Sequence, residues 1–259
     1  FILAEAGTGT GKSLAYLVPA LYWTSQNHAF GESVVISTHT KNLQDQLFFK
    51  DIPLLEKILP ISFRAVLLKG RGNYLCMNKW KSIILDPSAH LTAPEREKII
   101  PVFLWLKETK SGDIGECSGF PLDQNTSLWN KLASESAYCQ AHKCNSSDAC
   151  FVKKIRDEAR KAHVVIVNHS LLFSDLISEN AVLGEYHNLI LDEAHHIEKT
   201  AQNYLGVEFS MWTTKSFIAS LYERDQMETG TLILLKQKIA SAVLLPLEKT
   251  HAEKSVAAA

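Results

Sequence analysis

The residues best suited to chemistry open the chain, where the apolar start of FILAEAGTGTGKS runs into a glycine-rich stretch that ends on Lys12 and Ser13. Glycine has no Cβ, so such a loop can present successive backbone N–H groups to phosphate oxygens. Lys12 would add a mobile positive charge at the terminal phosphates, and the Ser13 hydroxyl would be a ligand of Mg²⁺. The sequence therefore predicts a phosphate-binding loop formed by Ala6, Gly7, Thr8, Gly9, Thr10, Gly11, Lys12 and Ser13.

This loop pattern has Ala6 where a glycine is usual, which is a mild change because alanine is the next smallest residue. The alternative is a flexible loop that opens an amphipathic helix. We favour the phosphate loop because an apolar strand is expected before it and a helix, residues 12–26 with a kink at Pro19, after it.

A second candidate is the carboxylate pair Asp192 and Glu193, which directly follows the apolar run NLIL. Beside a phosphate loop, one carboxylate at a strand end holds Mg²⁺ and the next acts as base for the attacking water. We assign these roles to Asp192 and Glu193 in that order. His195 is expected to sense the nucleotide by bridging to a neighbouring motif, and His196 to be solvated. The alternative is an ordinary helix start, where acidic residues are common.

The chain has five cysteines, an odd number that favours metal or redox chemistry over a disulfide framework. Four and five residues separate Cys139, Cys144 and Cys150, and Cys76 lies far upstream. Four thiolates from two segments suit tetrahedral Zn²⁺ or an iron–sulfur cluster. The absence of a C-x₂-C knuckle favours a [4Fe–4S] cluster. Cys117 is expected to be a spare, free side chain, and unrelated buried cysteines are the alternative for the whole set.

Basic residues surround the cysteines and form the best candidate surface for phosphates; they are Lys69, Arg71, Lys79, Lys81, Lys153, Lys154, Arg156, Arg160 and Lys161. Asp157 and Glu158 temper the second group, so a solvated helix face is the alternative there. Tyr74 and Trp80 would either stack on bases or belong to the core.

Composition limits the classes of protein to which the chain can belong. Its 259 residues, 46% of them hydrophobic, are enough for one large or two modest domains with a real core. A net charge of −1 gives no global attraction to nucleic acid, so polyanions would bind at local patches. No apolar run is long enough for a membrane span and no signal segment opens the chain, which predicts a cytoplasmic protein.

The expected elements describe an α/β fold with a parallel sheet. Short β-branched runs at residues 33–37, 63–68 and 164–168 and the run before Asp192 read as buried parallel strands. Polar residues follow the first of these strands, at the sheet edge where open α/β folds bind ligands. Residues 69–160 hold all the cysteines and no clear strand, so they read as an insertion. The chain beyond residue 207 is helical in pattern.

Taken in order, AEAGTGTGKS, STHTKNLQDQ, KGRGNYLC, the C-x₄-C-x₅-C triplet, VNHSLL and LDEAHHIE resemble the DinG branch of the XPD-like superfamily 2 DNA helicases. The resemblance spans roughly residues 1–206. It implies a RecA-like motor domain at residues 1–69 and 156–206, interrupted by a small helical iron–sulfur domain at 70–155. The start of a helical Arch domain would follow at 207–259.

The resemblance also implies an ATP-dependent helicase that moves 5′ to 3′ on single-stranded DNA and opens forked or displaced-strand duplexes, in repair or replication. ATP and Mg²⁺ would bind at the phosphate loop with Lys12, Asp192, Glu193 and His195, and Cys76, Cys139, Cys144 and Cys150 would hold the [4Fe–4S] cluster. The expected DNA contacts are Thr38, His39, Thr40, Asn42, Lys69, Arg71, Asn168 and His169.

The resemblance places the family's adenine-reading glutamine motif upstream of Phe1 and its second motor domain, with the arginine fingers, beyond Ala259. This stretch alone is therefore expected to bind nucleotide weakly and to hydrolyse it hardly at all, because an arginine finger is worth about 10³–10⁵ in rate. Two alternatives remain open: a zinc- or cluster-stabilised nucleic-acid-binding module with a vestigial motor, and a DinG-like nuclease, which would need an appended acidic domain.

Overall fold

The computed structural model describes residues 1–7, 9–135, 139, 144, 146–178, 180, 182–206, 210–224, 228–229 and 231–241. Thr8, one of the predicted phosphate-loop residues, lies outside them. The chain forms two compact units, Phe1–Leu205 and Gly206–Ala259. All of the motifs discussed above belong to the first unit.

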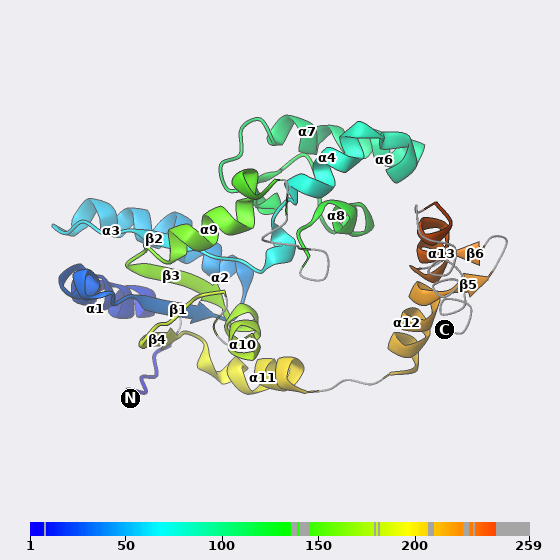
Figure 1. The fold of residues 1–259 in the computed structure, drawn as a ribbon. Coiled ribbons are helices and arrows are strands. Elements are labelled where there is room, and N and C mark those ends of the chain that lie inside the picture. The colour runs from blue at the N-terminus through cyan, green and yellow to red at the C-terminus, as the bar shows by residue number, and fades with distance from the viewer. Residues whose placement is uncertain are drawn as a thin grey trace. The chain divides into compact units, whose positions relative to one another are not determined.

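A parallel four-stranded sheet is the centre of the first unit (Figure 1), which confirms the predicted α/β class. Its strands are β1 (Val34–Thr38), β2 (Ala65–Leu67), β3 (Val164–Asn168) and β4 (Asn188–Leu191), in the order β2-β3-β1-β4. In the register of β1, Val34 lies beside Val164 of β3 and Asn188 of β4. Because all strands run the same way, their carboxyl ends meet at one edge of the sheet.

Helices cover both faces of the sheet (Figure 1), so alternate residues of β1 and β3 are buried in opposite directions. On one face Ile36 and Ile166 pack with residues of α1 (Lys12–Asn27), the π-helical segment Leu47–Asp51 and α3 (Ile52–Ile58). On the other face Val35 and Val165 pack with residues of α9 (Phe151–Ala159) and α10 (His169–Ile177). The continuous β-branched runs in the sequence reflect this double burial. The helix α1 continues through Pro19.

The strand expected before the phosphate loop is absent from residues 1–7. Phe1 and Ile2 are fully exposed, and β4 has no partner on its outer side among the described strands. Leu189 and Leu191 on that edge strand are 40% and 37% exposed. The expectation was wrong because a strand needs a hydrogen-bonded neighbour, and an apolar run alone does not supply one.

Residues between the second and third strands form a separate helical layer. Its helices are α4 (Met77–Leu85), α5 (Pro87–His90), α6 (Ala93–Lys98), α7 (Ile100–Trp105) and α8 (Thr126–Leu132), and α2 (Lys41–Gln46) precedes it on the sheet. Isolated antiparallel bridges, Tyr74 with Asp113 and Leu75 with Ala133, tie its base together. Gly112 there has φ 69°, and a Cβ at this position would lie 2.2 Å from the Phe151 ring. Only glycine fits this close approach.

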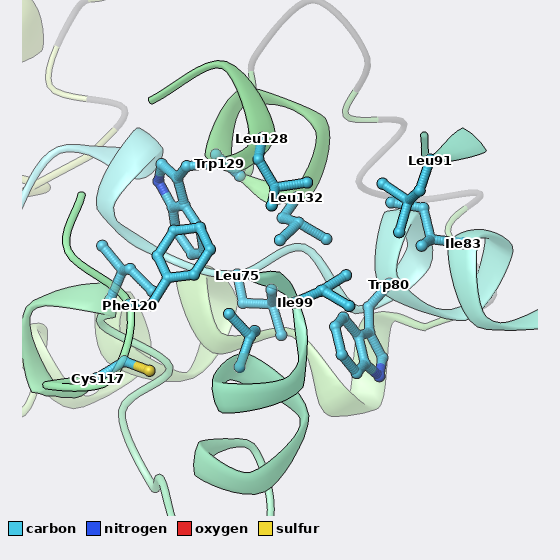
Figure 2. Close-up of a cluster of buried hydrophobic side chains, with 13 residues drawn as sticks. Leu75, Trp80, Ile83, Leu91, Ile99, Cys117, Phe120, Leu128, Trp129 and Leu132 are labelled. Atoms are coloured by element: carbon cyan, nitrogen blue, oxygen red, sulfur yellow. The ribbon is translucent and has the colours of Figure 1, made fainter. Parts of the chain in front are cut away.

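The inserted segment has its own hydrophobic core, shown in Figure 2. Trp129 lies 6.2 Å from Phe120 between ring centroids, and its indole Nε1 donates a hydrogen bond to the Gly72 carbonyl at 2.7 Å. Trp80 is 6% exposed and Tyr74, at the base of the segment, is 2% exposed, so both are buried and neither offers a stacking platform for bases. Cys117 is buried in the same core, in line with its interpretation as a spare cysteine.

The second unit contains α12 (Met211–Leu221), a short antiparallel pair β5 (Glu223–Arg224) and β6 (Glu228–Thr229), and α13 (Thr231–Ser241). Its largely helical character agrees with the pattern read from the sequence. Across the described part of the whole chain, no helix combines the length and the apolar character that crossing a membrane requires.

Candidate nucleotide-binding site

The N-terminus of α1 has the form of an anion-binding site. The helix begins at Lys12, and its N-cap residue Gly11 has left-handed backbone angles (φ 82°, ψ 21°), as does Gly9 (φ 77°). The loop closes on itself through a hydrogen bond from Thr10 Oγ1 to the Gly7 carbonyl at 2.8 Å. No side chain caps the first helical turn, so its N–H groups remain free for a ligand. Glycine is required here because other residues disfavour these angles.

The side chain of Lys12 meets the predicted carboxylate pair across the sheet edge. Its Nζ lies 3.0 Å from Asp192 Oδ1 and also bonds to Glu193 Oε1. Hydrogen bonds to Glu193 and Asp192 raise the pKa of Lys12, and the same contact with Lys12 lowers the pKa of the Glu193 carboxyl. These three residues, far apart in the sequence, therefore form one charged cluster.

Asp192 is held in place from three sides. Its backbone N–H donates to the Ser37 carbonyl at 2.8 Å, and its Oδ1 accepts the Glu193 N–H at 2.9 Å. Its Oδ2 accepts the Tyr16 hydroxyl at 3.0 Å. The side chain is only 6% exposed, so its orientation is fixed by these bonds. Glu193 has φ 54°, an unusual left-handed conformation for a residue with a side chain.

Tyr16 is a site residue that the sequence reasoning missed. It lies on α1 four residues after Lys12, and therefore on the same face of the helix. Burial, together with the nearby Asp192 charge, raises the pKa of Tyr16, so its hydroxyl stays protonated and acts as a donor. The helical spacing from Lys12 is the signal that would have found it.

The two histidines of the carboxylate segment exchange the behaviour expected of them. The His195 side chain is 66% exposed and lies 3.6 Å from Glu193. His196, expected to be solvated, is half-buried and stacks on His39 with ring centroids 3.8 Å apart. His196 is thus the residue that reaches a neighbouring segment, because the 3₁₀ turn Ala194–His196 directs it toward the end of β1.

The residues expected to contact DNA at the ends of β1 and β3 differ in exposure. Thr38 and His169 are fully buried, and His169 Nδ1 bonds to Ser37 Oγ at 2.7 Å. Their side chains do not reach solvent, so we do not retain them as DNA contacts. Thr40 and Asn168 cap α2 and α10 by accepting the N–H groups of residues 43 and 171. Asn42 is exposed and His39 half-exposed.

Lys69 also fails as a surface cation. It is 8% exposed, and its Nζ lies 2.8 Å from Asp113 Oδ2 and 3.0 Å from Asp45 Oδ1. Burial opposes its charge, but the two carboxylates outweigh burial and raise the pKa of Lys69. The expectation was wrong because a run of basic letters does not reveal acids brought in from elsewhere. Arg71 is half-buried and donates to the Glu135 carbonyl at 3.5 Å.

The four cysteines predicted to bind a cluster meet that expectation only in part. Cys76 and Cys150 occupy the N-cap positions of α4 and α9, where a helix dipole favours a thiolate. Cys150 lines a cavity of about 290 Å³ together with Met77, the neighbour of Cys76. Among the described residues, no three cysteine, histidine or acidic side chains are grouped closely enough to hold a metal ion. Cys139 and Cys144 adjoin positions 138, 140–143 and 145, which lie outside that set.

Comparison with known proteins places the chain among helicase sequences, although no family model matches it. It is 37% identical over 209 residues, 79% of this chain, to a protein of Haemophilus influenzae named ATP-dependent DNA helicase YoaA. It is 34% identical over 229 residues, 82% of this chain, to ATP-dependent helicase DinG of Mycobacterium tuberculosis. It is also 33% identical over 234 residues, 87% of this chain, to the Bacillus subtilis protein named 3′-5′ exonuclease DinG.

The matched regions make up 31%, 34% and 24% of those three proteins, so the chain spans about a third of their length or less. The parallel sheet with helices on both faces defines an α/β protein. The similarity then identifies the family: the chain belongs to the DinG family, as its motifs predicted.

Proposed function

We propose that this chain supplies the first motor domain of an ATP-dependent DNA helicase. The observation that carries the proposal is the meeting of Lys12 with Asp192 and Glu193 at the N-terminus of α1. A free helix terminus, a lysine and strand-end carboxylates are the parts that phosphoryl transfer to water requires. The relatives named ATP-dependent DNA helicases support ATP and DNA as ligands.

Each residue then has a definite task. The phosphates of ATP would take over Lys12 from the two carboxylates, and the first-turn N–H groups of α1 would bind the remaining charge. Freed of Lys12, Asp192 would hold Mg²⁺ together with Ser13, while Tyr16 keeps the Asp192 carboxylate oriented. Glu193 would accept the proton of the attacking water. ATP binding thus replaces the internal ion pairs.

The finer features of the function are part of the same proposal. Residues 1–69 and 156–206 would form a RecA-like domain, with the iron–sulfur domain at 70–155 and the Arch at 207–259. Movement would run 5′ to 3′ on single-stranded DNA at forked or displaced strands, in repair or replication. Exposed Asn42 and half-exposed His39 and Arg71 are the expected DNA contacts that face solvent.

A [4Fe–4S] cluster held by Cys76, Cys139, Cys144 and Cys150 is proposed from the sequence and from the helix-start positions of Cys76 and Cys150. When bound, such a cluster would cross-link the two ends of the inserted segment. Zinc at the same cysteines would instead favour the alternative of a nucleic-acid-binding module.

The motor is tested by Lys12→Ala in the full-length gene product, with Lys57→Ala, an exposed lysine of α3, as the matched control. Removing Lys12 should lower DNA-stimulated ATP turnover by about 10²-fold or more and abolish unwinding, since it deletes the charge that stabilises the transferring phosphate. DNA binding should be retained. Unwinding that survives the Lys12 change would refute the proposal.

The cluster is tested on anaerobically purified full-length protein by its visible absorption and its iron, sulfide and zinc content. A broad thiolate-to-iron band with near-equal iron and sulfide is expected, and it should be lost in Cys144→Ser but kept in Cys117→Ala. Cys117 is the matched control because it lies in the apolar core. A colourless protein containing zinc would refute the cluster.

A further inference from the structure

Four histidines gather at the carboxyl ends of three neighbouring strands. His39 follows β1, His169 follows β3, and His195 and His196 follow β4. The His39 and His196 rings stack with centroids 3.8 Å apart and an interplanar angle of 17°. His195 lies 4.0 Å from His196, and His169 lies 6.2 Å from His39. The four side chains form a row across the edge of the sheet.

Only one contact in this row joins the carboxylate turn to a different segment by close stacking. His196 is tied to that turn because its backbone N–H donates to the Glu193 carbonyl at 3.0 Å. Glu193 has left-handed backbone angles, so a change in its backbone conformation would carry the 3₁₀ turn Ala194–His196 with it. The His196 ring therefore reports the position of the carboxylates.

The other half of the stack belongs to the segment between β1 and α2. His39 lies between buried Thr38 and Thr40, whose hydroxyl accepts the Leu43 N–H and caps α2. Movement of the His39 ring would therefore be passed to the start of α2, where Asn42 faces solvent. Two stacked rings in van der Waals contact transmit such a movement because neither can shift far without a clash.

We propose that the His39–His196 stack couples the carboxylate turn to the β1–α2 segment, with His196 acting as a positioning residue. The inference rests on the proposed function, since the turn would bind ATP and the segment would bind DNA. When ATP separates Glu193 from Lys12, the turn rearranges, and the stacked rings carry that change to the DNA-binding segment. By reciprocity, DNA bound at the segment favours the hydrolysing arrangement of the turn.

The test measures ATP turnover of the full-length gene product with and without oligothymidylate. His196→Ala should lower the ratio of stimulated to basal turnover about fivefold or more, the low end of typical coupling between sites. His196→Phe keeps a flat ring and should retain most of the ratio. His187→Ala is the matched control, because His187 is 72% exposed and pairs only with Glu32 among the printed contacts. Thermal unfolding shows that each variant is folded.

A double-mutant cycle shows whether the stack itself carries the coupling. His39→Ala should reduce the ratio as His196→Ala does, and the double variant should be no worse than either, because the two changes remove one shared contact. The coupling is refuted if His196→Ala keeps the wild-type ratio, if His196→Phe falls as far as His196→Ala, or if the two losses add. A wild-type protein that DNA does not stimulate would instead refute the proposed function.

Discussion

The carboxyl edge of the sheet and the inserted segment hold their polar residues in different ways. At the sheet edge, backbone hydrogen bonds align the strands, so Asp192 at the end of β4 is bonded to Ser37 at the end of β1. In the inserted segment, a core around Trp80 and Trp129 gathers short helices, and Cys76 and Cys150 stand at helix starts outside that core. The ladder dictates the first site, whereas packing leaves the cysteines at the periphery.

The two regions are joined by the buried ion pairs of Lys69. Asp45 belongs to α2 on the sheet, and Asp113 belongs to the inserted segment. A second link runs from Lys41 Nζ to Asn73 Oδ1 at 2.7 Å. The inserted segment is thus fastened to the helix that carries the proposed DNA-binding residue Asn42. This arrangement suggests that the contrast between the regions is one of construction and not of mechanical independence.

The largest effect is expected from breaking that fastening with Lys69→Met. The change leaves Asp113 and Asp45 without their cation, which should lower the free energy of unfolding by about 3 kcal/mol. This is the low end of the range for a broken buried pair, because Asp45 is 40% exposed. Urea unfolding measures the loss, and Lys81→Met, at an exposed position of α4, should change stability by less than about 0.5 kcal/mol. Equal stability of the two variants would show that the regions are not joined at Lys69.

The sequence was informative where regular structure determines position. The β-branched runs located all four strands of the sheet, and the residues after them necessarily share one edge, which is why Lys12, Asp192 and Glu193 come together. It was uninformative about burial of single polar residues. Nothing in the local pattern around Lys69 or His169 indicates the acids or the serine that surround them.

The remaining differences have physical causes of the same kind. Residues 1–7 are apolar but lack a strand partner, so the expected first strand does not form. The stack of His196 on His39 depends on the left-handed turn at Glu193, which adjacent letters do not predict. The cysteine group depends on loops instead of strands, so its spacing restricts the possible ligands without determining their geometry.

An intermediate effect is expected from Tyr16→Phe, which tests how sharply the sheet edge is organised. The change removes one hydrogen bond to the Asp192 carboxylate and leaves the ring in place. A bond to a charged group contributes about 1.5–3 kcal/mol, so turnover at limiting Mg²⁺ should fall about tenfold or more. The control is Tyr22→Phe on the same helix, where the side chain is 38% exposed. The test is a Mg²⁺ titration of ATP turnover in the full-length protein, and identical curves would remove Tyr16 from the site.

The smallest effect concerns a second histidine stack at the opposite, amino end of the sheet, which provides a structural counterpart to the His39–His196 pair. His163 stacks on His28 at 3.9 Å between centroids, and its Nδ1 accepts the Arg64 N–H at 3.0 Å. Burial, then the neighbouring His28 and Arg64, lower the pKa of His163. Its stabilising contribution is therefore complete at neutral pH and is lost with acidification, because below about pH 6.5 the unfolded chain takes up a proton that the folded chain resists.

The free energy of unfolding should consequently fall between pH 7 and pH 5, with His163 contributing at most about 1.4 kcal/mol per pH unit, the limit for one proton. His163→Gln cannot take up that proton, so its stability should depend less steeply on pH than that of the wild type. His187→Gln, at an exposed position, should follow the wild-type slope. Urea unfolding at several pH values compares the three proteins. If all three slopes coincide, the amino-end stack is pH-insensitive, and stacking of two imidazoles in this sheet does not by itself exclude the charged form.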